Sequence, residues 1–71
     1  MTQNNLGRAL FDQAERSEGA EAARLLSEAV GAYREALEVY TVEYSPFRHD
    51  VVAKNLQMAE AHLKKLRASA Q

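Results

Sequence analysis

The sequence predicts an all-α fold in which one antiparallel helix pair is followed by a capping helix, within a single domain over residues 1–71. Apolar residues recur every three or four positions in three stretches, which is the spacing of one helix face. Only two short segments, Ser17-Glu18-Gly19 and Ser45-Pro46, break this pattern. The motif Asn5-Leu6 returns 50 residues later as Asn55-Leu56, as expected where a helical repeat begins again.

The first helix is expected over about residues 2–16, where Thr2 or Asn4 can cap its amino end. Gly19 can adopt the left-handed conformation that ends a helix, whereas Ser17 could instead cap the next one. The apolar residues of this stretch share one face: Leu6, Leu10, Phe11 and Ala14.

The second helix is expected over about residues 20–43. Gly31 lies within it, at a cost of up to about 1 kcal/mol relative to alanine, which a helix tolerates better where a neighbouring helix must approach closely. Pro46 disfavours helical backbone at Ser45 but suits the first position of a following helix. The apolar stripe of the second helix extends over about five turns: Leu25, Leu26, Ala29, Val30, Tyr33, Ala36, Leu37, Tyr40 and Tyr44.

The third helix is expected over about residues 46–68, with two apolar faces. One is a heptad seam that should pack on the second helix. The other, which we call the apolar strip, either stays exposed and faces a partner or folds over the first helix to complete a three-helix core. The seam consists of Val52, Leu56, Ala59, Leu63 and Leu66, and the apolar strip of Phe47, Val51, Met58 and Ala61.

The composition argues against several classes of function. The chain has no cysteine and only two histidines, so we expect no structural zinc and no cofactor. His49 and Asp50 are adjacent and therefore do not face each other on a helix, and no nucleophile accompanies them, so we do not expect an enzyme. No apolar run approaches the roughly 20 residues of a membrane span and no signal peptide is visible, so a soluble cytoplasmic protein is expected.

Charge is distributed unevenly along the chain. Residues 1–45 hold four arginines and eight acidic residues, a net charge of −4, whereas residues 46–71 have a net charge of +3. The asymmetry could orient a head-to-tail or antiparallel association, or Lys64, Lys65 and Arg67 could simply complement the dipole of the last helix. No dense basic stripe with aromatic residues is present, so we expect no nucleic-acid partner.

These residues resemble the tetratricopeptide repeat, particularly long-repeat bacterial variants and the kinesin light chain type. Leu6-Gly7 matches the first helix of that family, and Ala29, Tyr33 and Ala36 match the second. The resemblance implies a right-handed α-α superhelix. Two features depart from the family: the period is 50 rather than about 34 residues, and Gln57 stands where a glycine would follow the leucine, which suits a terminal capping helix.

The resemblance also implies a function, that of a protein-interaction or scaffold module. Since at least three repeats are usually needed for a stable stack, either the chain is an excised piece of a longer protein or copies of it complete the stack between them. Self-association into a homo-oligomer through exposed apolar helix faces is expected. The alternative is a purely structural oligomerisation element without a peptide-binding groove. In the family, a protein or peptide partner lies in the groove lined by the first helix of each repeat, which corresponds here to Asn4, Arg8, Phe11, Asp12, Val51, Lys54, Met58 and His62.

Overall fold

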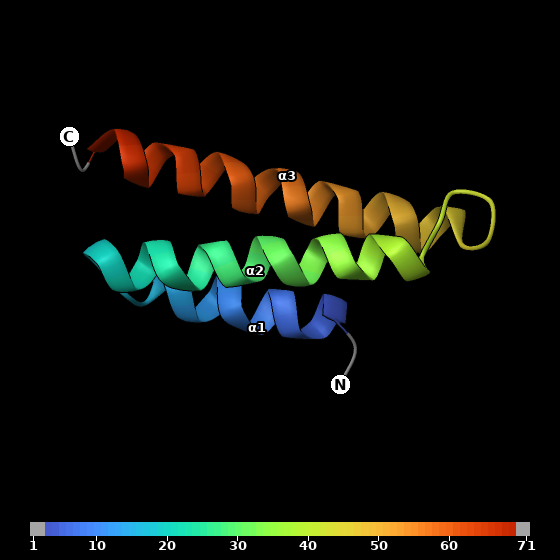
Figure 1. The fold of residues 1–71 in the computed structure, drawn as a ribbon, viewed down its shortest axis with the longest axis horizontal. Helices are drawn as coiled ribbons and strands as arrows, with labels where there is room; N and C mark the ends of the chain where they lie inside the picture. Colours follow the sequence, from blue (N-terminus) through green and yellow to red (C-terminus); the bar gives the residue numbers. More distant parts are fainter. Residues whose placement is uncertain (1–2, 70–71) are drawn as a thin grey trace.

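The computed structural model describes residues 3–69, which form three helices and no strand. They are α1 (Gln3–Glu15), α2 (Gly19–Val39) and α3 (Pro46–Ser69). α2 lies between the other two and runs antiparallel to both (Figure 1). The expected all-α class is therefore confirmed. Thr2, the expected start and candidate cap of the first helix, lies outside the described residues.

The junction between α1 and α2 is formed by Ser17 and Gly19. The Ser17 hydroxyl donates to the carbonyl oxygen of Gln13 at 2.9 Å, and its backbone N–H donates to that of Ala14 at 3.1 Å. Ser17 thus ends α1 and does not cap α2, since Glu18 occupies the capping position and makes no side-chain bond there. Gly19 has the expected left-handed conformation, with a φ of +59°, but it is the first residue of α2 and does not end α1.

α2 ends at Val39, earlier than the expected position near residue 43. The backbone N–H of Tyr40 closes the last turn on Ala36, and that of Tyr44 donates to the Thr41 hydroxyl at 3.2 Å. β-branched residues such as Val39 and Thr41 favour helices less, and the Thr41 hydroxyl offers the backbone an alternative partner. Tyr44 is consequently 79% exposed and does not belong to the apolar stripe of α2.

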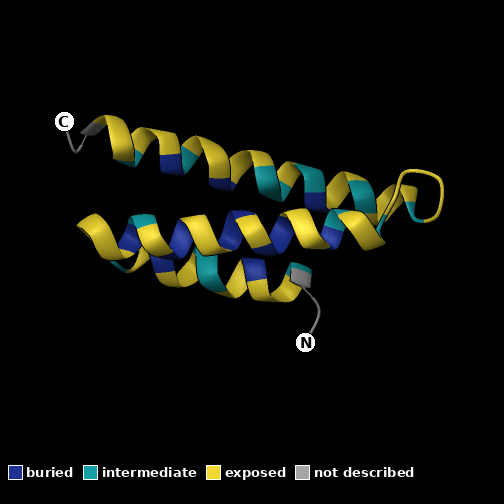
Figure 2. Cartoon of the chain, viewed as in Figure 1, coloured by how far each residue is buried: buried dark blue, intermediate teal, exposed yellow. Residues whose placement is uncertain are grey.

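The core lies along two sides of α2, where dark blue residues mark the contacts with α1 and α3 (Figure 2). Leu10 and Phe11 of α1 pack against both of its buried clusters. From the expected heptad seam of α3, Val52, Ala59 and Leu63 are buried, so its packing on α2 is confirmed. One cluster contains Ala29, Val30, Tyr33, Ala36, Val52 and Ala59, and the other Ala14, Leu25, Leu26 and Leu63.

The closest approach of α1 to α2 occurs at Gly7. A Cβ atom added to Gly7 would lie 2.6 Å from Cε1 of Tyr33, whose side chain is buried. A glycine is therefore needed where the tyrosine ring crosses α1. Around Gly31, by contrast, an added Cβ would meet nothing within 4 Å, so no helix of the described chain makes the close approach that this glycine suggested.

α3 makes few contacts with α1. The side-chain amide of Asn55 donates to Oδ1 of Asn4 at 3.4 Å, and the His62 ring meets Phe11 edge-on at 5.8 Å between centroids. The two residues of each contact are separated by 51 positions in the sequence, and an equal separation is expected where two helices run parallel. The apolar strip stays exposed, with Phe47 at 79% and Met58 at 58%, and α3 does not fold over α1.

We expect Gly7→Ala to lower the free energy of unfolding by about 1–3 kcal/mol, because the new methyl group overlaps the ring of Tyr33 and neither backbone nor ring can shift freely. Gly31→Ala is the matched control, since it fills open space in a helix interior and should raise stability by about 0.5–1 kcal/mol. Urea denaturation followed by circular dichroism measures both. Equal effects of the two substitutions would contradict the packing described here.

Candidate functional site

A groove runs between α1 and α3, and its larger pocket has a volume of about 290 Å³. Tyr33 is the one lining residue from the middle helix, so its buried ring forms the base of the pocket. α1 and α3 supply the two walls. The lining residues are Arg8, Phe11, Asp12, Glu15, Tyr33, Asn55 and Met58.

A second pocket of about 260 Å³ lies in the same groove, towards the amino ends of α1 and α3. The guanidinium of Arg48 lies over the ring of Tyr40, 5.4 Å from its centroid, at a distance suited to a cation–π contact. Because Asn4 lines this pocket and Asn55 the larger one, their hydrogen bond marks the boundary between the two. The second pocket is lined by Asn4, Asn5, Tyr40, Phe47, Arg48, Val51 and Val52.

The structure brings most of the expected groove residues to these two pockets. Arg8, Phe11, Asp12 and Met58 line the larger pocket, and Asn4 and Val51 line the second. His62 contacts Phe11. Lys54 lines neither pocket; its Nζ atom lies 3.1 Å from the carboxylate of Asp50, on the exposed surface of α3.

Three residues of the larger pocket were not among those expected from the sequence: Glu15, Tyr33 and Asn55. Asn55 belongs to the repeated Asn-Leu motif, which singled it out without indicating that it faces α1. Tyr33 was expected only as a packing residue, and it lines the pocket because its buried ring lies beneath the space between α1 and α3. Glu15 lies one turn beyond Phe11 on the same side of α1, so helical spacing alone could have identified it.

The larger pocket combines one basic and two acidic side chains around an aromatic base. Burial raises the pKa of Tyr33 above its ordinary value, the positive charge of Arg8 partly lowers it again, and the negative charge of Asp12 adds to the rise. The Tyr33 side chain is therefore a neutral group at physiological pH. The pocket offers a partner apolar contact, one cation and two carboxylates.

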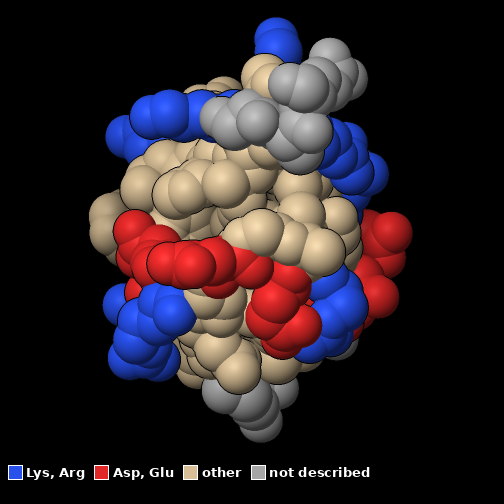
Figure 3. All heavy atoms as spheres, turned by 90° about the vertical axis from the view of Figure 1, so that its left-hand side faces the viewer, with Lys and Arg blue, Asp and Glu red and all other residues tan. Residues whose placement is uncertain are grey.

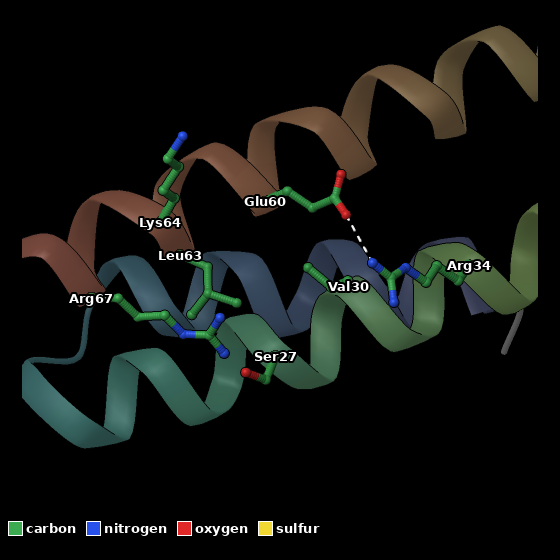
Figure 4. A pocket seen from close by; sticks show the side chains of 7 residues that line it. All are labelled: Ser27, Val30, Arg34, Glu60, Leu63, Lys64 and Arg67. Atoms are coloured by element: carbon green, nitrogen blue, oxygen red, sulfur yellow. Dashed lines mark hydrogen bonds and ion pairs between the residues drawn. The ribbon is translucent and has the colours of Figure 1, made fainter.

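A further pocket, of about 530 Å³, lies between α2 and α3, outside the α1–α3 groove (Figure 4). Its Arg34 already pairs with Glu60 across the two helices at 3.0 Å. Arg67 extends towards Ser27, whereas Lys64 points away from the pocket (Figure 4). Because these cations do not converge on one point, the pocket does not present a defined anion site.

Charged side chains surround the end of the molecule where α1 joins α2 and α3 ends. Figure 3 shows basic side chains at the top, over α3, an acidic band across the middle and further basic side chains below this band. None of the helices within residues 3–69 combines the length and apolarity needed to cross a bilayer. Within the same range, no three His, Cys, Asp or Glu side chains are grouped so as to hold a metal ion.

We expect the free energy of unfolding to fall as the pH rises past about 10, the ordinary pKa of tyrosine. Because the pKa of Tyr33 is raised in the folded state, its stabilising effect is complete below the unfolded pKa and is lost as the pH rises through the folded value. Urea denaturation between about pH 8 and about pH 11 measures this. Tyr33→Phe has no proton to lose and should show a smaller decline; an identical decline would contradict the assignment.

Comparison with family models, curated proteins and solved structures finds no match for this chain. The resemblance to tetratricopeptide repeats therefore stays a prediction, which rests on Leu6-Gly7 in α1 and on the spacing of Ala29, Tyr33 and Ala36 in α2. In this chain the close approach of Gly7 to the ring of Tyr33 explains why a glycine in α1 occurs together with an aromatic residue in α2.

Proposed function

We propose that this chain is a protein-interaction module of the tetratricopeptide type, which acts as a scaffold in the cytoplasm and binds a segment of another protein in the α1–α3 groove. The observation that supports the proposal is the larger pocket, where a buried aromatic base lies between two helix walls with charged side chains. A concave, partly apolar surface with a few polar groups is the usual form of a binding site.

The lining of the larger pocket indicates the chemistry of its partner. Phe11 and Met58 offer apolar contact, and the flexible thioether of Met58 adapts to different side chains. Arg8 can bind a side-chain or terminal carboxylate through two parallel hydrogen bonds. Asp12 and Glu15 attract a cation. The partner segment is therefore a peptide with an apolar side chain flanked by one acidic and one basic group.

Selection from a random peptide library against the immobilised chain tests this function. The selected peptides should contain an apolar residue with flanking charges, and Arg8→Glu should weaken their binding at least about tenfold, as expected when a charge-assisted bond is replaced by repulsion. Fluorescence anisotropy at protein concentrations below any self-association measures the affinity.

Arg16→Glu is the matched control, because Arg16 is exposed just after α1 and lines neither pocket of the groove. It makes the same change of charge and should leave binding unchanged. Peptides that bind both variants as tightly as the original chain, or a library that yields no binder, would contradict binding in the groove.

We further propose that the chain self-associates through the apolar strip on α3. A more restricted function, a structural oligomerisation element that makes no use of the groove, is the second candidate, and the exposure of Phe47 and Met58 favours it. In both cases another copy of the chain covers the apolar strip, so self-association and peptide binding in the groove compete for Met58.

Sedimentation equilibrium over a wide concentration range should give a mass above the 7.9 kDa of one chain. Val51→Ala combined with Met58→Ala should return the chain to a monomer, because both side chains are exposed parts of the strip. Val42→Ala removes a similar exposed side chain in the turn before α3 and should leave the oligomer intact. A monomer at every concentration would contradict self-association.

A further inference from the structure

A fourth surface hollow, of about 370 Å³, lies between α1 and α2 and has no assigned role. Leu6 and Leu10 of α1 and Gly31 and Ala32 of α2 provide apolar or small groups. Leu6 is 38% exposed although it is a large apolar residue in the middle of α1. Glu28 and Glu35 complete the lining with two negative charges. We call this surface the acidic groove.

Gly31 makes the acidic groove accessible to a helix. An added Cβ at this position would meet nothing within 4 Å, so the helix surface is open there. A glycine in a helix interior is unfavourable by roughly 1 kcal/mol relative to alanine. Within residues 3–69 no contact accounts for it, whereas the approach of a helix from another molecule would.

α3 carries a surface that is complementary to the acidic groove. Lys54, Met58, Ala61 and Lys65 follow one another at steps of four, three and four residues, so they lie on one helix face. All four are exposed. The face places the apolar Met58 and the small Ala61, both members of the apolar strip, between two lysines. We call it the basic face.

The charges of these two surfaces indicate which of them can meet. Two basic faces would bring lysines together, and two acidic grooves would bring glutamates together, so each surface repels its own kind. Glu35 and Lys65 form no ion pair within the part of the chain that the structure describes. They are thus free to pair between molecules, whereas Glu28 already pairs with Arg24 at 2.9 Å and Lys54 with Asp50 at 3.1 Å.

We propose that the acidic groove between α1 and α2 receives the basic face of α3 from a second copy of this chain. The proposal rests on the self-association inferred above and specifies its geometry. On α2, Gly31 and Glu35 of the acidic groove lie two positions either side of Tyr33, so they face away from the α1–α3 groove that Met58 lines. Because the two surfaces face opposite sides of the molecule, the contact is head-to-tail, and each copy can receive one neighbour while it docks on another. Such an assembly grows into a ring or a filament and does not stop at a symmetric dimer.

Two double variants test the geometry. Gly31→Leu with Glu35→Lys blocks the acidic groove, and Ala61→Leu with Lys65→Glu blocks the basic face. All four positions are exposed, so both variants should remain folded by circular dichroism. Each variant alone should associate at least about tenfold more weakly than the original chain in sedimentation equilibrium.

An equimolar mixture of the two variants is the decisive sample. Each retains the surface that the other lacks, so the mixture should form a complex of twice the 7.9 kDa chain mass and nothing larger. As a matched control, Ala9→Leu with Arg16→Glu alters exposed positions in and just after α1, outside the acidic groove, and should associate like the original chain.

The outcomes separate this proposal from the one on which it rests. An original chain that is monomeric at every concentration overturns self-association altogether. An original chain that associates while both variants do so equally well overturns only the head-to-tail geometry. Variants that are monomeric both alone and in the mixture show that the two surfaces do not meet, which also overturns it.

Discussion

The contact between Gly7 and the ring of Tyr33 determines how α1 lies on α2. Any side chain at residue 7 would overlap the ring, so the two helices can be this close only because one of them has no Cβ there. The same ring forms the base of the larger pocket between α1 and α3. One packing constraint thus sets both the helix pair and the depth of the candidate binding site.

Much of the remaining core consists of small residues, and this limits the stability of the chain. Ala22, Ala29, Ala32 and Ala36 of α2 are buried, yet each removes little apolar area from water. The Cα atoms span only 14 Å along the shortest axis, which leaves room for few large buried side chains. A chain of 71 residues is already near the lower limit for a self-sufficient core, so covering exposed apolar groups by association would stabilise it.

α3 has three faces, and each of them lies in a different environment. Its seam packs on α2, Asn55 and His62 contact α1, and Lys54 and Lys65 lie on exposed surface. Because α3 packs on α2 and not over α1, the groove between α1 and α3 stays open. The peptide binding and the head-to-tail docking that we propose would therefore use neighbouring sides of the same helix, with Met58 at their border.

The sequence by itself determined the three helices, the two breaks and the packing of the seam on α2, because apolar periodicity, Gly19 and Pro46 act over a few residues. It did not reveal the early end of α2, where the side chain of Thr41 competes for a backbone N–H. Only the tertiary structure decided that the ring of Tyr33 needs Gly7, that Lys54 lies outside the groove and that nothing in the described chain covers Gly31. Those facts depend on the relative placement of whole helices, and periodicity specifies which face is apolar but not where that face meets its neighbour.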